Sequence, residues 1–270
     1  FARRHTLGAI GGAIVLLFVL TGLLAPTLAP YDPNAVSIRD ALQGPSRAHP
    51  LGTDNNGRDL LSRVMYGARI SLSISVSAVA LGAVAGITLG LIAGWYRRLE
   101  GVTMRLMDVM LSFPGIIFAL TIIAILGNGL LNVILAIAVY QAPQYARLAH
   151  SMTLSVKESV YIDAIVSVGA SDRHILGRYV LPNILSPLIV QTSLLIPAAI
   201  MTTASLAFLG LGVTPPTAEW GSMLQNSLSW ARMAPHVMIF PGLALMLVVF
   251  GFNVFGDGLR DALDPRLRER

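Results

Sequence analysis

Residues 109–146 read VMLSFPGIIFALTIIAILGNGLLNVILAIAVYQAPQYA and contain no Asp, Glu, Lys or Arg. A membrane-spanning helix needs about 20 apolar residues, so this stretch is long enough for two spans. The Gly-Asn-Gly turn at 127–129 separates them. Pro114 predicts a kink near the start of the first, which a membrane tolerates because neighbouring helices satisfy the freed backbone carbonyl. The stretch therefore indicates a protein that is embedded in lipid.

The composition of the whole chain agrees with this interpretation. Its 270 residues are 54% hydrophobic and 12% charged, with a mean hydropathy of +0.69, whereas soluble domains carry about 25% charged residues. These values argue against a soluble globule, a disordered chain or a coiled coil. Cysteine is absent, which excludes disulfide frameworks and thiolate sites. Because the first residue is Phe1, we expect the chain to be trimmed at its start.

Four further uncharged segments bring the predicted spans to six. They are residues 7–29, 70–95, 185–208 and 237–256. The predicted fold is therefore an all-α polytopic membrane protein with six transmembrane helices. We expect residues 58–69 to form a separate helix along the membrane surface, since apolar and charged positions alternate there at helical spacing.

The basic residues predict the orientation of these spans. Thirteen of the 19 Lys and Arg residues lie in the N-terminal segment, in 97–105, in 147–178 and in the C-terminal tail. Cytoplasmic loops carry such an excess, so we expect both termini in the cytoplasm. This distribution explains the net charge of +5 by contact with a lipid bilayer, and we expect no nucleic acid partner.

A ladder of glycines runs along the second predicted span. Gly82, Gly86, Gly90 and Gly94 recur every four residues and so share one face of a helix. Helices in lipid associate through close van der Waals fit, and small residues permit it. We expect this face to pack tightly against another helix, within the chain or in a neighbouring subunit.

Several kinds of chemistry are missing from the sequence. Lys157 is the only lysine and does not follow a glycine-rich loop, so the chain cannot bind ATP in a P-loop. We expect no catalytic residue, no metal site and no cofactor on this chain. Two of the charge-free segments that hold spans offer no ion relay, which disfavours ion-driven transport. Two alternatives stay open: a stand-alone secondary carrier, and an intramembrane aspartyl protease using Asp257.

One segment between spans is long enough to offer a shaped surface to a partner. Residues 161–183 read YIDAIVSVGASDRHILGRYVLPN, and their pattern predicts two short helices joined by a turn at Gly169. Ser171 or Asp172 can cap the second helix. A short helix with an apolar stripe suits the groove of another protein, although a loop that packs on its own chain has the same pattern.

This segment resembles the EAA loop of ABC importer permeases. Asp163-Ala164-Ile165, then Gly169, then Leu181-Pro182 have the spacing of that motif, with Asp, Ile and Tyr replacing its usual residues at 163, 165 and 179. Residues 49–72, 209–224 and 256–267 are similar to the permeases of the dipeptide, oligopeptide and nickel class, in particular to the second permease of such a pair.

The resemblance implies a type I importer permease in the bacterial inner membrane. Residues 1–68 would form the first span and an extracytoplasmic segment, 69–260 the permease domain, and 261–270 a cytoplasmic tail. The implied partners are a second homologous permease, two ATPase subunits or domains that bind ATP and Mg²⁺, and an extracytoplasmic substrate-binding protein. The resemblance also implies alternating access, with peptides as the usual substrate and nickel, opines, glutathione or sugars left open.

Site residues follow from the same resemblance. Residues 161–172 would be the coupling helix, and Pro182 would end the arm leading into the fifth span. The residues implied in ATPase coupling are Ile162, Asp163, Ala164, Ile165, Val168, Gly169, Ala170, Asp172, Arg173, Leu181 and Pro182. Those implied to face the binding protein or the outer gate are Asp54, Arg58, Asp59, Pro215, Pro216, Glu219 and Trp220. Without the resemblance, Trp220 is equally well explained as an interfacial anchor and Pro215-Pro216 as a rigid turn.

Overall fold

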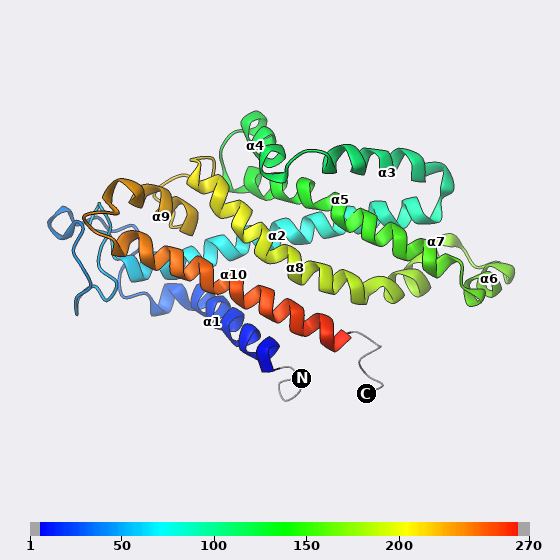
Figure 1. Ribbon diagram of the computed structural model, residues 1–270, viewed down its shortest axis with the longest axis horizontal. Helices are drawn as coiled ribbons and strands as arrows, with labels where there is room; N and C mark the ends of the chain where they lie inside the picture. The colour runs from blue at the N-terminus through cyan, green and yellow to red at the C-terminus, as the bar shows by residue number, and fades with distance from the viewer. Residues whose placement is uncertain (1–5, 264–270) are drawn as a thin grey trace.

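The computed structural model describes residues 6–263, and every regular element in this part of the chain is helical. The elements are α1 (Thr6–Leu28), a 3-10 helix (Ile38–Asp40), α2 (Leu60–Trp95), α3 (Arg97–Leu111), α4 (Gly115–Leu126), α5 (Leu130–Lys157), α6 (Val160–Ser167), α7 (Asp172–Ile175), a π-helical turn (Leu176–Val180), α8 (Leu181–Phe208), α9 (Trp220–Ser227), a second 3-10 helix (Leu228–Trp230) and α10 (His236–Leu263). Helices α2, α5, α8 and α10 run along the length of the molecule, with α9 at one end and α6 at the other (Figure 1). We refer to these as the α9 end and the α6 end.

Four helical segments of the described chain are long and apolar enough to cross a membrane. They are α1, α2, the continuous stretch Asp172–Phe208, and α10. Helices α3 and α4 pass the same test only as a pair. The all-helical membrane fold predicted from the sequence is therefore confirmed at this level of detail.

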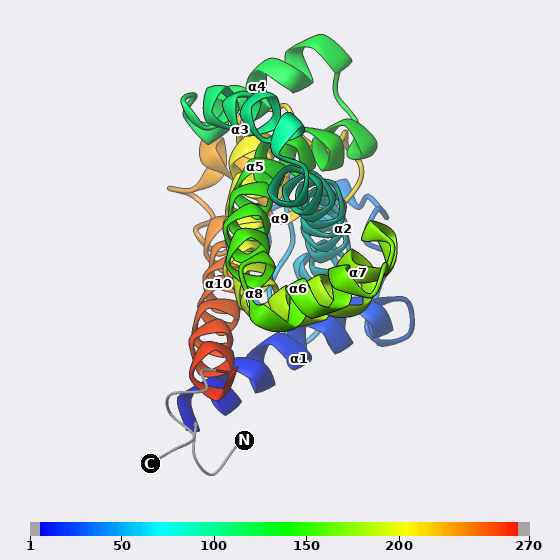
Figure 2. The same cartoon turned by 90° about the vertical axis from the view of Figure 1, so that its right-hand side faces the viewer.

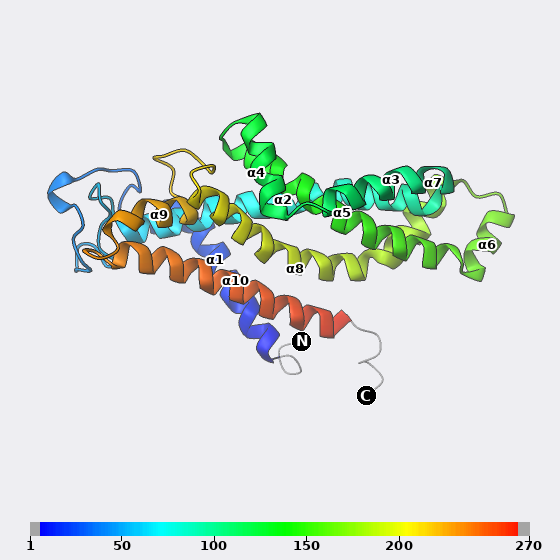
Figure 3. The same cartoon turned by 45° about the horizontal axis from the view of Figure 1, so that its top comes forward.

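The predicted kink at Pro114 is a full break, because α3 and α4 meet at an angle of 96°. Proline cannot donate a backbone hydrogen bond and disfavours a helical conformation of the residue before it. The start of α4 then packs on α5, since a Cβ atom on Gly115 would collide with the ring of Tyr140. The third predicted span is thus two helices, of which α4 projects from the rest of the bundle (Figures 1 and 3).

The fourth predicted span falls within α5, which is not among the four apolar candidates. Its 28 residues correspond to roughly 42 Å of helix, which exceeds the hydrocarbon thickness of a bilayer. Asn132, Gln141 and Gln144 make this helix more polar than the four apolar candidates. Helix α5 is long enough to span, but composition alone does not identify it as a span.

Helix α2 corrects the prediction of a surface helix at 58–69. It begins at Leu60 and continues without a break to Trp95. The polar side chains at its start are buried against the preceding loop instead of lying on a membrane surface: the Asp59 carboxylate accepts from the backbone N–H of Ser62 at 2.7 Å, and Arg63 is 3% exposed. No proline lies between this turn and the apolar part, so one helix forms.

The glycine ladder of α2 lies against α5. Added Cβ atoms would stand 2.8 Å from the carbonyl oxygen of Ala138 at Gly82, and 2.7 Å from the Cβ of Tyr145 at Gly86. At Gly94 the nearest atom, 2.8 Å away, is a Thr153 side-chain carbon. The two backbones therefore approach each other over more than three helical turns. This α2–α5 contact forms the centre of the bundle.

Helices α1 and α10 pack against each other on one side of the α2–α5 pair. A Cβ atom on Gly11 would be 2.7 Å from the carbonyl oxygen of Gly251, so the two backbones are in direct contact. Seen along the bundle, α1 crosses beneath the other helices and meets the end of α10 (Figure 2). Helix α10 extends seven residues past the predicted end at Gly256, to Leu263. The N-terminal Arg3 and Arg4, and positions 264–270 of the predicted tail, lie outside the described residues.

The fifth predicted span starts earlier than expected. Helix α7 passes through the π-helical turn directly into α8, and Pro182 occupies the second position of α8. The family resemblance implied that Pro182 ends an arm before this span. The structure instead places Pro182 within α8. Pro182 cannot donate a backbone hydrogen bond, and the wider π turn directly before it accommodates this loss within the continuous helix.

Candidate functional site

Helix α6 is held at its end of the bundle by a small buried cluster. Ile162 is 1% exposed and packs with Trp95, Ile175 and Val180. These residues come from α6, the end of α2, α7 and the π turn. One buried isoleucine thus joins α6 to the end of α2 and to the helical segment that leads into α8.

Lys157, the last residue of α5, joins α5 to Trp95 of this cluster and was not singled out as a site residue by the sequence. Its ammonium nitrogen Nζ donates to the carbonyl oxygen of Trp95 at 2.7 Å and lies 5.2 Å from the centre of the indole ring. The carbonyl belongs to the last residue of α2, where a cation offsets the negative end of the helix dipole. The signal available in the sequence was that this is the only lysine of the chain.

The remaining surface of α6 is exposed and partly apolar. Val160 is 84% exposed, Val166 50% and Val168 83%. Asp163 and Ala164 are exposed beside them. We call these five residues the α6 surface. Large exposed apolar side chains gathered on one helix are typical of a protein interaction site.

Gly169 ends the α6 surface with a turn that needs glycine. Its φ is +81°, and a Cβ atom placed on it would meet nothing within 4 Å. Left-handed backbone costs a non-glycine residue about 1–2 kcal/mol. A side chain at this position therefore meets no atom of the described chain at its Cβ.

The other residues implied in coupling lie around this turn. Ile165 and Ala170 are half-buried against the anchoring cluster, whereas Asp172 and Arg173 are exposed on α7. A hydrogen bond from the Tyr96 phenol to the Asp172 carboxylate raises the pKa of Tyr96. Leu181 and Pro182 begin α8, 12 residues beyond Gly169 in the chain, and are not part of the α6 surface.

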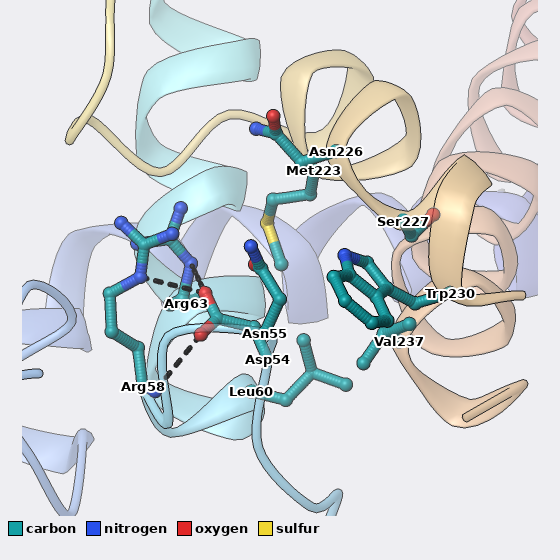
Figure 4. Close-up of a pocket in the computed structure, with 10 residues that line it drawn as sticks. All are labelled: Asp54, Asn55, Arg58, Leu60, Arg63, Met223, Asn226, Ser227, Trp230 and Val237. Atoms are coloured by element: carbon teal, nitrogen blue, oxygen red, sulfur yellow. Dashed lines mark hydrogen bonds and ion pairs between the residues drawn. The ribbon is translucent and has the colours of Figure 1, made fainter. Parts of the chain in front are cut away.

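At the α9 end, the charged residues of the loop before α2 form a compact network. Arg58 Nε lies 2.7 Å and Arg63 Nε 3.5 Å from Asp54 Oδ2 (Figure 4). The adjoining cavity, which Met223 and Trp230 also line, has a volume of about 20 Å³. That is room for a water molecule and far too little for a peptide. The network therefore stabilises the loop and is not a substrate site.

Asp59 is also structural. Its carboxylate caps α2 through Ser62 and lies 2.9 Å from His49 Nδ1. It is 2% exposed, so it cannot meet a docking protein directly. The expectation that Asp59 faces the binding protein conflicts with this burial.

Glu219 and Trp220 are buried where α9 begins. The Glu219 carboxylate accepts from the backbone N–H groups of Gly221 at 2.9 Å and Ser222 at 2.8 Å, and from the Ser71 hydroxyl at 3.2 Å. Burial raises the pKa of Glu219, against the opposing effect of these hydrogen bonds. The carboxylate is thus an N-cap that also joins α9 to α2.

Trp220 is fully buried, which excludes the interfacial anchor considered above. Its ring occupies the space left by Gly67, and its Nε1–H donates to the carbonyl oxygen of Val64 at 3.1 Å. The indole N–H therefore has its hydrogen-bond partner inside the protein, whereas an interfacial anchor would place the indole at the membrane surface. Of the outer residues, Pro215 and Pro216 are exposed and joined by a cis peptide bond.

A larger cavity lies between α5, α8 and α10 toward the α6 end, and the sequence did not indicate it. Its volume is about 580 Å³, which is in the range of small-molecule sites. Asn183, Ser186, Gln191 and Arg260 supply polar groups to a lining that is otherwise apolar.

Comparisons with known proteins agree with this arrangement. Residues 86–269 match the family described as "Binding-protein-dependent transport system inner membrane component", and residues 2–45 match the "N-terminal TM domain of oligopeptide transport permease C". A glutathione transport system permease protein, GsiD, of Pectobacterium atrosepticum is 46% identical over 99% of this chain and 89% of its own length. A dipeptide transport system permease protein, DppC, of Alkalihalophilus pseudofirmus is 43% identical over 98% of this chain and 88% of its own.

Solved structures share the fold at much lower identity. A chain from inward-facing conformations of the MetNI methionine ABC transporter aligns with a TM-score of 0.61 at 19% identity, over 75% of this chain and 96% of that one. A chain from an amino acid ABC transporter aligns with a TM-score of 0.53 at 14% identity, over 77% and 94%. These similarities concern the arrangement of helices alone.

Proposed function

We propose that this chain, which belongs to the family of binding-protein-dependent transport system inner membrane components, lines the pathway of an importer for small peptides or a related solute. The chain is a permease subunit of an ABC importer and a multi-pass protein of the bacterial inner membrane. It catalyses no reaction itself, and ATPase and substrate-binding components complete the importer. Peptides and glutathione are named for its relatives, which supports that substrate class here.

The α6 surface is the observation that carries the mechanism. We infer that it docks in a groove of an ATPase subunit and that the buried Ile162 transmits the movement of that subunit to α2 and α8. ATP and Mg²⁺ would bind to the ATPase, and no cofactor to this chain. Alternating access then follows from rigid-body movement of helices that pack too closely to deform.

Two further parts of the assembly are proposed with it. A second homologous permease would complete the pathway, and two ATPase subunits or domains would bind beneath the pair. The substrate-binding protein would dock at the α9 end, where Pro215 and Pro216 are exposed. Asp54, Arg58, Asp59, Glu219 and Trp220 would support that surface from within, since each is buried.

We also propose six spans with both termini in the cytoplasm. The bent pair α3–α4 would be the third span and α5 the fourth, because α5 packs along the spanning helix α2 through the glycine ladder. The absence of native cysteine permits a direct test. Single cysteines at the exposed positions Val168 and Thr214 should react with an impermeant maleimide from opposite sides of the membrane, and labelling from the same side would contradict this topology.

The alternatives gain no support. Family membership places the energy source in a partner ATPase, which argues against a stand-alone secondary carrier. Asp257 is an exposed side chain near the end of α10, and its nearest carboxylate in sequence within the described chain, Asp261, is exposed on the same helix. This is not the buried aspartate pair that an intramembrane protease needs.

The coupling role is tested by comparing Gly169→Arg with Gly169→Ala. Both variants place a side chain at φ +81° and nothing in this chain lies within 4 Å of the added Cβ, so both bear the same backbone cost of about 1–2 kcal/mol. Only the arginine is large enough to disturb a docked partner. We expect both variants to insert into the membrane, and Gly169→Ala to retain uptake and co-purification of the ATPase.

The arginine variant should lose both uptake and the ATPase. Mass spectrometry of the complex purified in mild detergent, with an ATPase assay on the eluate, measures the second effect. Uptake by Gly169→Arg at the rate of Gly169→Ala would refute the docking role. In that case the substrate-binding protein found in the eluate would still identify the substrate.

A further inference from the structure

An arginine lies on the outside of the bundle where α1 and α2 cross. Gly22 of α1 contacts the backbone of α2 there, since a Cβ on Gly22 would stand 2.9 Å from the amide nitrogen of Arg69. From this crossing the two helices diverge toward the start of α1 (Figures 1 and 3). The divergence leaves a groove of about 280 Å³ between them.

The groove has an apolar lining with one charged residue. Val19 and Leu23 of α1 and Leu72 and Val76 of α2 form most of its surface. Leu23 is 66% and Val76 46% exposed, so the groove opens away from the bundle. Apart from Arg69, the polar residue of the lining is Ser73, whose hydroxyl already donates to the backbone carbonyl of Ile70.

Arg69 differs from Arg58 and Arg63, the two arginines that precede it in the chain. The side chains of Arg58 and Arg63 are ion-paired to Asp54. Arg69 is exposed and makes no ion pair or side-chain hydrogen bond with the residues that the structure describes. An unpaired arginine on a lipid-facing helix is costly unless its head group reaches the membrane surface or an anion.

The depth of Arg69 permits such a contact. It lies beside Gly22, six residues before the end of α1 at Leu28, which is about 9 Å along the helix. The long arginine side chain can extend toward that end of the helix and reach the lipid head groups. Its charge is then at phosphate level, while the groove continues toward the hydrocarbon.

We propose that this groove binds an anionic phospholipid, with the lipid phosphate on the Arg69 guanidinium and one acyl chain along Val19, Leu23, Leu72 and Val76. The apolar lining selects a lipid over a free phosphate ion, since a free ion gains nothing from it. The guanidinium favours a head group with net negative charge, because each basic residue near a membrane surface attracts anionic lipid. This site is independent of the transport function proposed above.

Native mass spectrometry of the purified membrane protein, with the subunits that co-purify, tests the proposal. Phosphatidylglycerol and phosphatidylcholine are added in turn, and the occupancy of bound lipid is compared between variants. Arg69→Gln should lower phosphatidylglycerol binding about fivefold, to the level of phosphatidylcholine. Arg39→Gln removes an exposed charge at the same end of the molecule but outside the groove, and should leave lipid binding unchanged.

A second variant tests whether the acyl chain binds along the apolar lining of the groove. Val76→Trp fills the groove from its exposed side without changing the charge, and should also lower phosphatidylglycerol binding. The proposal fails if Arg69→Gln binds lipid as the unmodified protein does, or if Val76→Trp has no effect. It also fails if millimolar inorganic phosphate displaces the lipid, or if Arg69→Gln releases a neighbouring subunit while lipid binding persists.

Discussion

A single methyl group at Gly86 should force α2 away from α5. In the Gly86→Ala variant the new Cβ would lie 2.7 Å from the Cβ of Tyr145 and closer still to the carbonyl oxygen of Ala142, whereas ordinary contacts begin near 3.4 Å. Both obstacles are backbone or near-backbone atoms that cannot rotate aside. The helices must therefore separate by at least about 0.7 Å, the difference between the two distances.

That separation has a calculable cost. A gap of about 0.5–1 Å forfeits a quarter to a half of the dispersion energy of the atoms on its two sides, and overpacking of a well-packed interior typically costs about 1–3 kcal/mol. For a chain of this size we expect the midpoint of thermal unfolding in detergent to fall by about 2–10 °C. Gly101→Ala in α3 is the matched control, since nothing lies within 4 Å of its Cβ. It should be neutral or stabilising by up to about 1 kcal/mol through helix propensity.

The measurement is the unfolding midpoint of the two variants and the unmodified protein, purified in the same detergent. If Gly86→Ala unfolds at or above the midpoint of the unmodified protein, α2 and α5 are not held at the distance described. The reasoning from the glycine ladder would then be wrong. A fall in both variants would instead show that any alanine at a helical glycine is harmful, which also refutes it.

Two further variants test the α9 end. Burial raises the pKa of Glu219 above its ordinary value of 4.5, so its contribution to stability is fully present below that value and is lost as the pH rises through the folded-state pKa. Glu219→Gln should remove this part of the pH dependence and, by presenting an amide to the N–H donors at the start of α9, cost about 1–2 kcal/mol at neutral pH; unfolding midpoints from pH 4 to 8 measure both, and an unchanged pH profile contradicts the reasoning. Asp54→Asn leaves Arg58 and Arg63 buried without a counter-charge and should destabilise the protein by about 3 kcal/mol, measured by denaturant unfolding. The double variant with Arg58→Gln should recover part of that loss, and a further loss would show that Asp54 does not act through the ion pair.

The sequence by itself determined that the chain is an all-helical membrane protein and located its four long apolar helices, because bilayer thickness requires long uncharged runs that are visible without any tertiary contact. It also located the turn at Gly169, since a positive φ is a local property of one residue. The family was recognisable for the same reason, because its motif lies within one short segment. The glycine ladder likewise predicted a close contact with another helix, but the sequence did not indicate that this helix is α5.

Only the tertiary structure decided which polar residues are structural. The sequence assigned Glu219 and Trp220 to an outer docking surface, yet both are buried by contacts with α2, some 150 residues earlier in the chain. It placed a surface helix before α2 because it could not show that Arg63 is neutralised by Asp54 and donates to the Pro33 carbonyl. In each case the cost of burying a polar group is offset by a partner distant in sequence, so burial cannot be inferred from local pattern. The 96° break between α3 and α4 also depends on tertiary structure. Proline permits the break, but the packing of α4 on α5 sets its angle.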